Sequence, residues 1–160
     1  LKIMNSPRNR VFVLLLGVVL ILVPHHNPTL YSHYEHTPIN GWEKVDRLSF
    51  SIPPIRDGGT FREDVGLRIN GAYPFMGLTL IVEQQVFPSG TKYSDTLSCK
   101  LIDDDGNIRG EGVCFYQYQF HLCDLELAKG DSLHVSVRHN MKREILPGIS
   151  DVGVTLRRKN

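Results

Sequence analysis

Histidine and aspartate residues in two short segments are spaced as metal ligands can be. A neutral imidazole is a common ligand, and His33-x-x-His36 places two of them three positions apart. No cysteine or regular ligand pattern completes a site, so a solvated segment is the favoured interpretation. The run DDDGN at 103–107 resembles the start of a calcium loop, but Gly112 stands where that loop needs Glu. We expect a polar hairpin turn, with Gly106 or Asn107 at positive φ.

Three cysteines could take part in redox chemistry if the chain is exported, because exported proteins meet oxidising conditions. They are Cys99, Cys114 and Cys123. One pair could form a disulfide and leave one thiol free, or all three could be buried as small hydrophobic residues. Cys99 lies on an alternating apolar face, which favours burial at that position.

A nucleophilic enzyme would draw on His121, His134 or His139. None of them lies in a nucleophile motif such as G-x-S-x-G, and His134 falls on the outward face of a predicted strand. The phosphate-binding patterns G-x-x-x-x-G-K-[ST] and G-x-G-x-x-G do not occur either. We therefore predict no catalytic residue, no metal site and no cofactor, and a protein that is not an enzyme.

The charge of the chain is close to balanced, with 18 Lys and Arg against 17 Asp and Glu in 160 residues. A nucleic-acid-binding protein normally carries a clear basic excess, so we expect no nucleic-acid partner. Charged residues at 22% and hydrophobic residues at 41% are ordinary for a folded domain. This composition excludes both wholesale disorder and a membrane protein with several spans.

The first 24 residues differ from the rest in charge and hydropathy. Three basic residues precede the apolar run VFVLLLGVVLILV at 11–23, and Pro24 ends it. A membrane-spanning helix needs about 20 apolar residues, whereas this shorter run fits the central region of a secretory signal. We expect residues 1–24 to be a signal peptide or signal-anchor helix. Residues 25–46 lack a sustained period and are rich in Pro, Asn, Ser and His, so we expect a linker there.

From residue 47 apolar residues alternate with a period of two, which is the pattern of a half-buried strand. Seven such runs lie within 48–52, 65–69, 78–82, 97–101, 116–120, 133–137 and 152–156, with Gly- and Pro-rich turns between them. The spacing predicts an all-β domain over 47–160, an antiparallel β-sandwich of about seven to nine strands. A closed barrel is the alternative. The basic residues at 157–159 would suit an exposed end that discourages edge pairing.

Several motifs occur in a defined order along this domain. They are Gly41-Trp42 with Asp46 and Phe50, Leu67-Arg68 with Tyr73-Pro74-Phe75, Asp95-Thr96, Asp105-Gly106 with Gly110 and Gly112, and HNMKREILPGISDVGV at 139–154. Together they resemble the gliding-motility lipoprotein GldH family. That family typically shows W-x-x-x-D-x-x-x-F, L-R-x-x-x-x-Y-P-[YF], D-T and a closing M-R-x-x-x-L-x-G-I-x-D-V-G. The resemblance covers about residues 31–158.

The resemblance implies a non-enzymatic accessory of the machinery for surface gliding and associated secretion, with other envelope proteins as partners. It also implies membrane anchoring in the cell envelope, with the domain facing the periplasm or the cell surface. The family is usually anchored by a lipidated Cys soon after the signal, but His25-His26-Asn27 stand there in this chain. Where the family has Met-Arg, Met141 is followed here by Lys142 and then Arg143.

Partner contacts are expected on aromatic and basic residues of these motifs, because such side chains are favoured where proteins meet. The expected set is Trp42, Arg68, Tyr73, Phe75, Met141, Arg143 and Asp151. Trp42 could instead pack in the core, and the segment 141–151 could be a loop that closes the sandwich. The alternative function is a cell-surface glycan-binding module, because Tyr116, Tyr118 and Phe120 share one face of a predicted strand. Burial of all three rings would remove the basis of that alternative.

Overall fold

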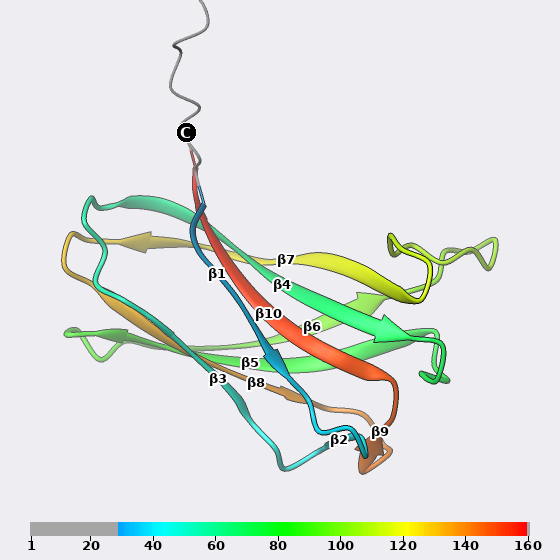
Figure 1. Cartoon of the computed structure of the whole chain (residues 1–160). Helices are drawn as coiled ribbons and strands as arrows, with labels where there is room; N and C mark the ends of the chain where they lie inside the picture. Colours follow the sequence, from blue (N-terminus) through cyan, green and yellow to red (C-terminus); the bar gives the residue numbers. More distant parts are fainter. Residues whose placement is uncertain (1–28, 160) are drawn as a thin grey trace, which may run out of the picture.

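The computed structural model describes residues 29–159, and the regular structure in this part is entirely β (Figure 1). Its ten strands are β1 (Thr29–His36), β2 (Trp42–Glu43), β3 (Leu48–Ile52), β4 (Gly59–Asn70), β5 (Gly77–Phe87), β6 (Lys92–Lys100), β7 (Phe115–Leu127), β8 (Ser132–His139), β9 (Ile145–Leu146) and β10 (Ile149–Arg158). The predicted all-β antiparallel fold is confirmed. The predicted signal segment at 1–24 lies outside the described residues. Within residues 29–159, no helix has the length and apolar character needed to cross a membrane.

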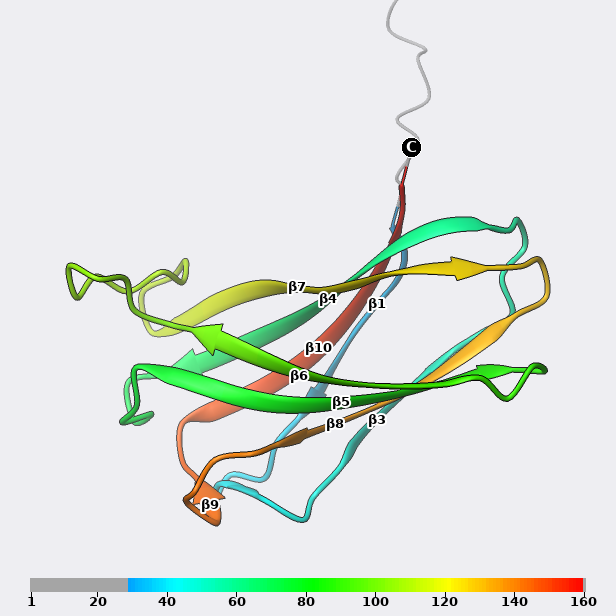
Figure 2. The same cartoon turned by 180° about the vertical axis from the view of Figure 1, so that it is seen from behind.

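Two four-stranded sheets form the two layers of the sandwich (Figures 1 and 2). One has the order β1-β10-β4-β7, which we call sheet A, and the other has the order β3-β8-β5-β6, which we call sheet C. All neighbouring strands are antiparallel. The short strands β2 and β9 pair only with each other and make a ribbon at one end of the molecule.

Alternating apolar residues build the core because successive side chains of a strand point to opposite faces. Nine inward-facing apolar side chains of the two sheets have no exposed surface at all: Val65, Leu67, Leu80, Val82, Val135, Val137, Val152, Val154 and Leu156. Truncating a side chain of this kind typically costs about 2–5 kcal/mol, since a cavity is left behind. The core therefore fixes the register of the central strands.

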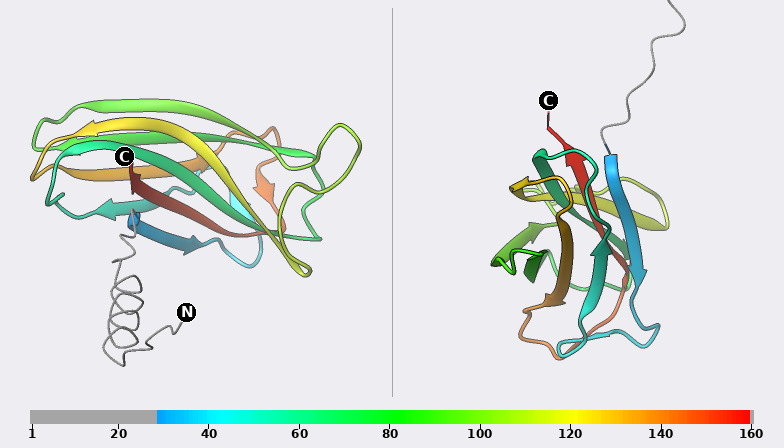
Figure 3. Two further views of the ribbon diagram at one scale, coloured as in Figure 1. Left: turned by 90° about the horizontal axis from the view of Figure 1, so that it is seen from above. Right: turned by 90° about the vertical axis from the view of Figure 1, so that its left-hand side faces the viewer.

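The structure differs from the expected linker over 25–46, because its described part contains β1 and β2. β1 pairs with β10 along its whole length, from Thr29 opposite Arg157 to His36 opposite Asp151 (Figure 3). No residue of β1 is fully buried, and its exposed and half-buried residues do not alternate regularly. Apolar residues do not alternate along such a strand, so the sequence offers no signal for it. Only the composition of the segment remains to be interpreted, and this composition favours a linker.

The last strand also differs from the expectation of an exposed end. β10 lies inside sheet A, between β1 and β4. The basic residues at its end bind neighbouring segments. Arg157 donates from Nη2 to Gln119 Oε1 at 3.0 Å, and Arg158 donates from Nη2 to the Gly58 carbonyl at 2.7 Å. These charges therefore hold the end of a central strand in place.

The segment 103–107 forms the polar turn that its sequence predicts. Asp103 Oδ1 accepts hydrogen bonds from the backbone N–H groups of Asp105 at 3.0 Å and Asn107 at 2.8 Å. Gly106 has a φ of 85°, a conformation that residues with a Cβ rarely adopt. These hydrogen bonds lower the pKa of Asp103. The acidic residues here shape a turn between β6 and β7.

One polar cluster lies between the sheets, where an apolar core would be expected. Glu63 on β4 and Gln84 on β5 are fully buried, and the half-buried Cys123 on β7 lies beside both. The Cys123 thiol is 3.9 Å from Glu63 Oε2 and accepts from Gln84 Nε2 at 3.5 Å. Burial, with a smaller contribution from Asp95, raises the pKa of Glu63 from 4.5 to about 8. At neutral pH Glu63 is therefore mostly protonated.

This buried carboxyl predicts a pH-dependent stability. The folded chain keeps a proton on Glu63 between pH 4.5 and about 8, and the unfolded chain releases it. The contribution of Glu63 to the free energy of unfolding therefore falls as the pH rises through this window. Glu63→Gln removes that loss, so at pH 8 it should be more stable than the wild type by about 1–3 kcal/mol. Urea unfolding at pH 5 and pH 8 measures this difference, with the exposed Glu43→Gln as the matched control. An identical pH dependence in Glu63→Gln and the wild type would contradict the assignment.

Candidate functional site

The outer face of sheet A contains two glycines that lie side by side on neighbouring strands. Gly153 on β10 is in register with Gly66 on β4 and with Tyr34 on β1. The ring of Tyr34 lies across both glycines, so that a Cβ at Gly153 would be 2.7 Å from three ring atoms. A Cβ at Gly66 would collide with the Tyr34 hydroxyl. Glycine in a strand interior often marks such a close approach.

Two of the motif residues, Arg68 and Asp151, complete the surroundings of Tyr34, which we call the seat of Tyr34. The Arg68 guanidinium lies 4.2 Å from the centroid of the Tyr34 ring, within the range of a cation–π contact. Asp151 is buried, with Arg68 Nη1 4.0 Å from its Oδ2 and the Ser150 hydroxyl donating to it at 2.7 Å. His36 Nδ1 pairs with the other carboxylate oxygen. Arg68 and Asp151 thus connect β4 and β10 to both ends of the β1 segment 34–36.

Trp42 packs in the core, with no exposed surface. Its ring lies edge-on to the His139 ring, with centroids 5.3 Å apart. His139 Nε2 is 3.1 Å from the Trp42 carbonyl, and the Met141 N–H is 3.4 Å from Nδ1. Burial is the main cause that lowers the pKa of His139. A neutral imidazole that donates from Nε2 and accepts at Nδ1 satisfies both contacts, so His139 serves the structure of this end.

Tyr73 and Phe75 pack against each other, whereas Met141 contacts the start of β5. The Tyr73 and Phe75 rings are edge-to-face with centroids 5.5 Å apart, and the Tyr73 hydroxyl donates to the Gly77 carbonyl at 2.9 Å. Met141 Sδ accepts from the Thr79 N–H at 3.4 Å. All three side chains are half-buried against the core. Burial raises the pKa of Tyr73 well above its usual range.

The loop 71–76 and the segment 141–148 lie against each other at the end of the sandwich that carries β2 and β9. The Asn70 N–H donates to the Gly148 carbonyl at 2.8 Å, and Gly148 has a φ of 81°. A Cβ at Gly148 would collide with the backbone of Tyr73. We call residues 38–45, 71–76 and 141–148 together the closing end. Arg143 is exposed there.

The closing end exposes several large apolar side chains to solvent. Four large apolar side chains are between 44% and 104% exposed: Ile39, Val45, Met76 and Ile145. The basic residues Lys142 and Arg143 are exposed beside them. Glu43 and Glu144 are exposed at this end as well, and apolar side chains within a polar rim are a typical composition for a protein interface.

The histidine and cysteine candidates do not assemble a reactive site. His33 pairs with Glu35 at 2.9 Å and His36 with Asp151, so the two imidazoles face carboxylates. His121 lies between Asp64 at 3.5 Å and Asp124 at 3.7 Å, and His134 is exposed. Within residues 29–159 no group of three or more His, Cys, Asp or Glu side chains is placed to hold a metal ion. The three cysteines are free thiols, with Cys99 buried and Cys114 exposed.

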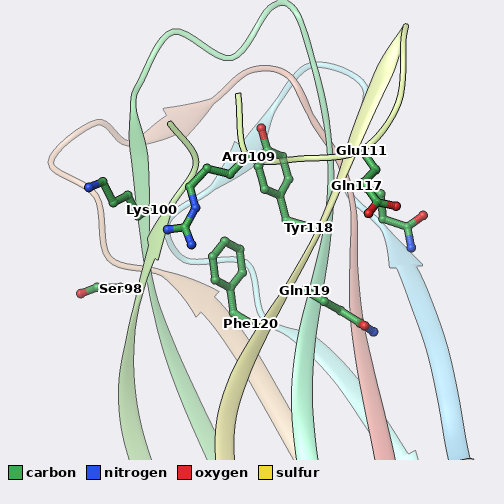
Figure 4. Close-up of a pocket in the computed structure, with 8 residues that line it drawn as sticks. All are labelled: Ser98, Lys100, Arg109, Glu111, Gln117, Tyr118, Gln119 and Phe120. Atoms are coloured by element: carbon green, nitrogen blue, oxygen red, sulfur yellow. The ribbon is translucent and has the colours of Figure 1, made fainter. Parts of the chain in front are cut away.

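Two of the three rings proposed for glycan binding, Tyr118 and Phe120, line a cleft between β6 and β7 (Figure 4). Tyr118 is buried, whereas Tyr116 and Phe120 are half-buried. Tyr118 and Phe120 are parallel, with centroids 6.1 Å apart. The cleft has a volume of about 440 Å³. The condition that would remove the glycan alternative, burial of all three rings, is therefore not met.

The model of the GldH lipoprotein family matches residues 29–156 of this chain, which is most of its length. The chain belongs to the GldH lipoprotein family. It is 28% identical over 155 residues to the gliding motility lipoprotein GldH of Flavobacterium johnsoniae, covering 92% of this chain and 96% of that protein. Membership implies a membrane-anchored protein of the cell envelope. The GldH match begins at the first residue of β1, in agreement with β1 as part of the domain.

Solved structures of other proteins resemble this domain only distantly. A family GH115 4-O-methyl-α-glucuronidase matches with a TM-score of 0.44 and 12% identity over 82% of this chain, which spans 18% of that enzyme. A family 35 carbohydrate-binding module from Clostridium thermocellum matches with a TM-score of 0.39 and 8% identity, covering 79% and 87% of the two chains. Likenesses at this level carry no argument about function.

Sequence reasoning missed Tyr34 and considered His36 only as a possible metal ligand, because both fall in the segment that we expected to be a linker. The signal that could have found them was the pair of glycines inside two predicted strands. An isolated Gly in a strand indicates a bulge or a close approach by another group. Gly66 and Gly153 both required a covering residue, and a Tyr upstream was available to provide it.

The seat of Tyr34 predicts a coupled pair of substitutions. Gly153→Ala should lower the free energy of unfolding by about 1–3 kcal/mol, because its Cβ would overlap the Tyr34 ring. In a Tyr34→Ala background the same change should cost clearly less, since the overlap is gone. Gly71→Ala is the matched control, because nothing lies within 4 Å of its Cβ. Urea unfolding of the four variants measures the coupling, and equal costs of Gly153→Ala in both backgrounds would disprove it.

Proposed function

We propose that this chain is a non-enzymatic accessory protein of the machinery for gliding and its associated secretion. It is held at the membrane through the segment before residue 29 and contacts other envelope proteins. The observation that carries the proposal is membership of the GldH lipoprotein family over nearly the whole domain. The folded part contributes a surface for association, because some of its motif residues stabilise the fold and others lie at the exposed closing end.

The position of the closing end supports this role. β1 begins at Thr29 and runs to His36, after which the chain turns into β2 at the closing end. Figure 1 shows the start of β1 and the β2–β9 ribbon at opposite ends of the molecule. A membrane-bound segment that enters at Thr29 would therefore leave the closing end pointing away from the bilayer. A partner in the periplasm or at the cell surface would meet this end first.

Different motif residues take different parts in this proposal. Arg143 is exposed at the closing end, and Tyr73, Phe75 and Met141 are half-buried beside it, so these four are the proposed partner contacts. Trp42 supports the end from within the core. Arg68 and Asp151 act indirectly, since their contacts go to Tyr34 and His36 on β1.

Charge reversal at the closing end tests the proposal. Lys142→Glu with Arg143→Glu should lower the recovery of cross-linked envelope partners about tenfold, because basic rim groups would then repel the partner surface that they attract. Both residues are exposed, so the melting temperature should stay unchanged. Arg56→Glu with Lys129→Glu makes the same charge change on exposed loops at the far end and serves as the control. Equal partner recovery from the two double variants would overturn the assignment of the closing end.

A further inference from the structure

A cleft between the two edge strands β6 and β7 lies outside the proposed partner surface. β6 is the last strand of sheet C and β7 the last strand of sheet A, so the sandwich is open on this side (Figure 2). The cleft has a volume of about 440 Å³, within the range of small-molecule sites. Its lining residues are Ser98, Lys100, Arg109, Glu111, Gln117, Tyr118, Gln119 and Phe120.

The loop after β6 closes the cleft at one end. Glu111 and Gln117 exchange backbone hydrogen bonds of 2.8 and 3.0 Å, so the loop lies against the start of β7. Gly110 lies directly over Tyr118, where a Cβ would be 2.6 Å from the ring. This closure blocks an extended strand from running along β7 past residue 117. A compact ligand fits the remaining space better than a peptide strand.

Arg109 gives the cleft its positive charge. Within residues 29–159, none of the ion pairs involves Arg109. Figure 4 shows its guanidinium pointing between β6 and β7, on the side of the Tyr118 and Phe120 rings. Glu111 is the one carboxylate in the lining, and Figure 4 draws it beside Gln117. Lys100 pairs with Asp104 at 2.5 Å, which leaves Arg109 as the cation available to a ligand.

The inward-facing side of β7 gives the cleft an aromatic wall. The half-buried Phe120 offers an apolar ring face, and the Tyr118 ring lies parallel to it. Figure 4 shows Ser98, Gln117 and Gln119 pointing away from Phe120, and Gln119 Oε1 accepts from Arg157, so these side chains form the rim of the cleft. An aromatic wall with one charged group beside it is typical of sites that bind a small molecule.

We propose that this cleft binds a sugar ring that bears a carboxylate, such as a hexuronic acid residue of a polysaccharide. Arg109 pairs with the carboxylate through two parallel N–H···O bonds, the geometry for which a guanidinium is suited. The apolar face of the ring packs on Phe120, and the hydroxyl groups stay toward the open side of the cleft. Ser98 and Lys100 border Met76 and Met141 of the closing end. Arg109 and Phe120 lie outside that end, so the substitutions that test the two assignments share no residue.

Titration of the full-length chain with D-glucuronic acid and D-galacturonic acid tests the site. Amide shifts in NMR spectra should change for residues 98–100, 109–111 and 117–120. D-glucose and D-galactose should bind at least tenfold more weakly, because they lack the carboxylate. Arg109→Ala should weaken uronate binding about tenfold and leave the weak binding of the neutral sugars unchanged. Arg56→Ala, which removes an exposed Arg far from the cleft, should leave uronate binding unchanged.

Two further variants separate the guanidinium and the ring. Arg109→Lys keeps the charge but loses the paired hydrogen bonds, so uronate binding should weaken severalfold. Phe120→Leu keeps an apolar side chain but loses the flat face, so uronate and neutral sugars should weaken together. Equal binding of neutral and acidic sugars, or acetate or a C-terminal peptide binding as tightly as the uronates, would overturn the proposal. Absence of shifts at millimolar uronate would do the same.

Discussion

The structure of this domain depends on one tight contact, the ring of Tyr34 laid across Gly153 and Gly66. The two glycines leave a shallow space on the outer face of β10 and β4, and only a side chain from a neighbouring strand can fill it. Tyr34 does so, and the guanidinium of Arg68 covers the ring from the other side. This contact makes β1 the fourth strand of sheet A, and β10 becomes a central strand as a result.

The same contact explains what several family motifs do. Arg68, Asp151 and Gly153 are separated in the sequence but meet around Tyr34 and His36. These residues hold β1, the first strand of the domain, against β10 and β4. The motif residues Tyr73 and Phe75 pack against each other in the loop 71–76, and Met141 accepts from the Thr79 N–H at the start of β5. The motifs therefore build both the β1 edge of sheet A and the closing end.

Alternation predicted the seven long strands from β3 onward, because each has an inward face that must be apolar. It could not predict β1, β2 and β9, since β1 has no fully buried residue and the other two are two residues long. The burial of Trp42 and His139 could not be predicted either. An aromatic residue in a motif looks the same in the sequence whether it packs in the core or contacts a partner. The burial of Glu63 could not be predicted from the sequence either, since only the packing of the two sheets shows that its carboxyl is buried.

Hydrogen exchange of the β1 amides tests most directly whether Tyr34 holds β1 in place. In the wild type, the inner amides of β1 should exchange slowly, as paired strand amides do. Tyr34→Ala should abolish this protection in β1 while β5 and β8 of sheet C stay protected, because they do not touch Tyr34. Protection of β1 that is the same in Tyr34→Ala and the wild type would contradict the account, because the strand would then be held without this contact.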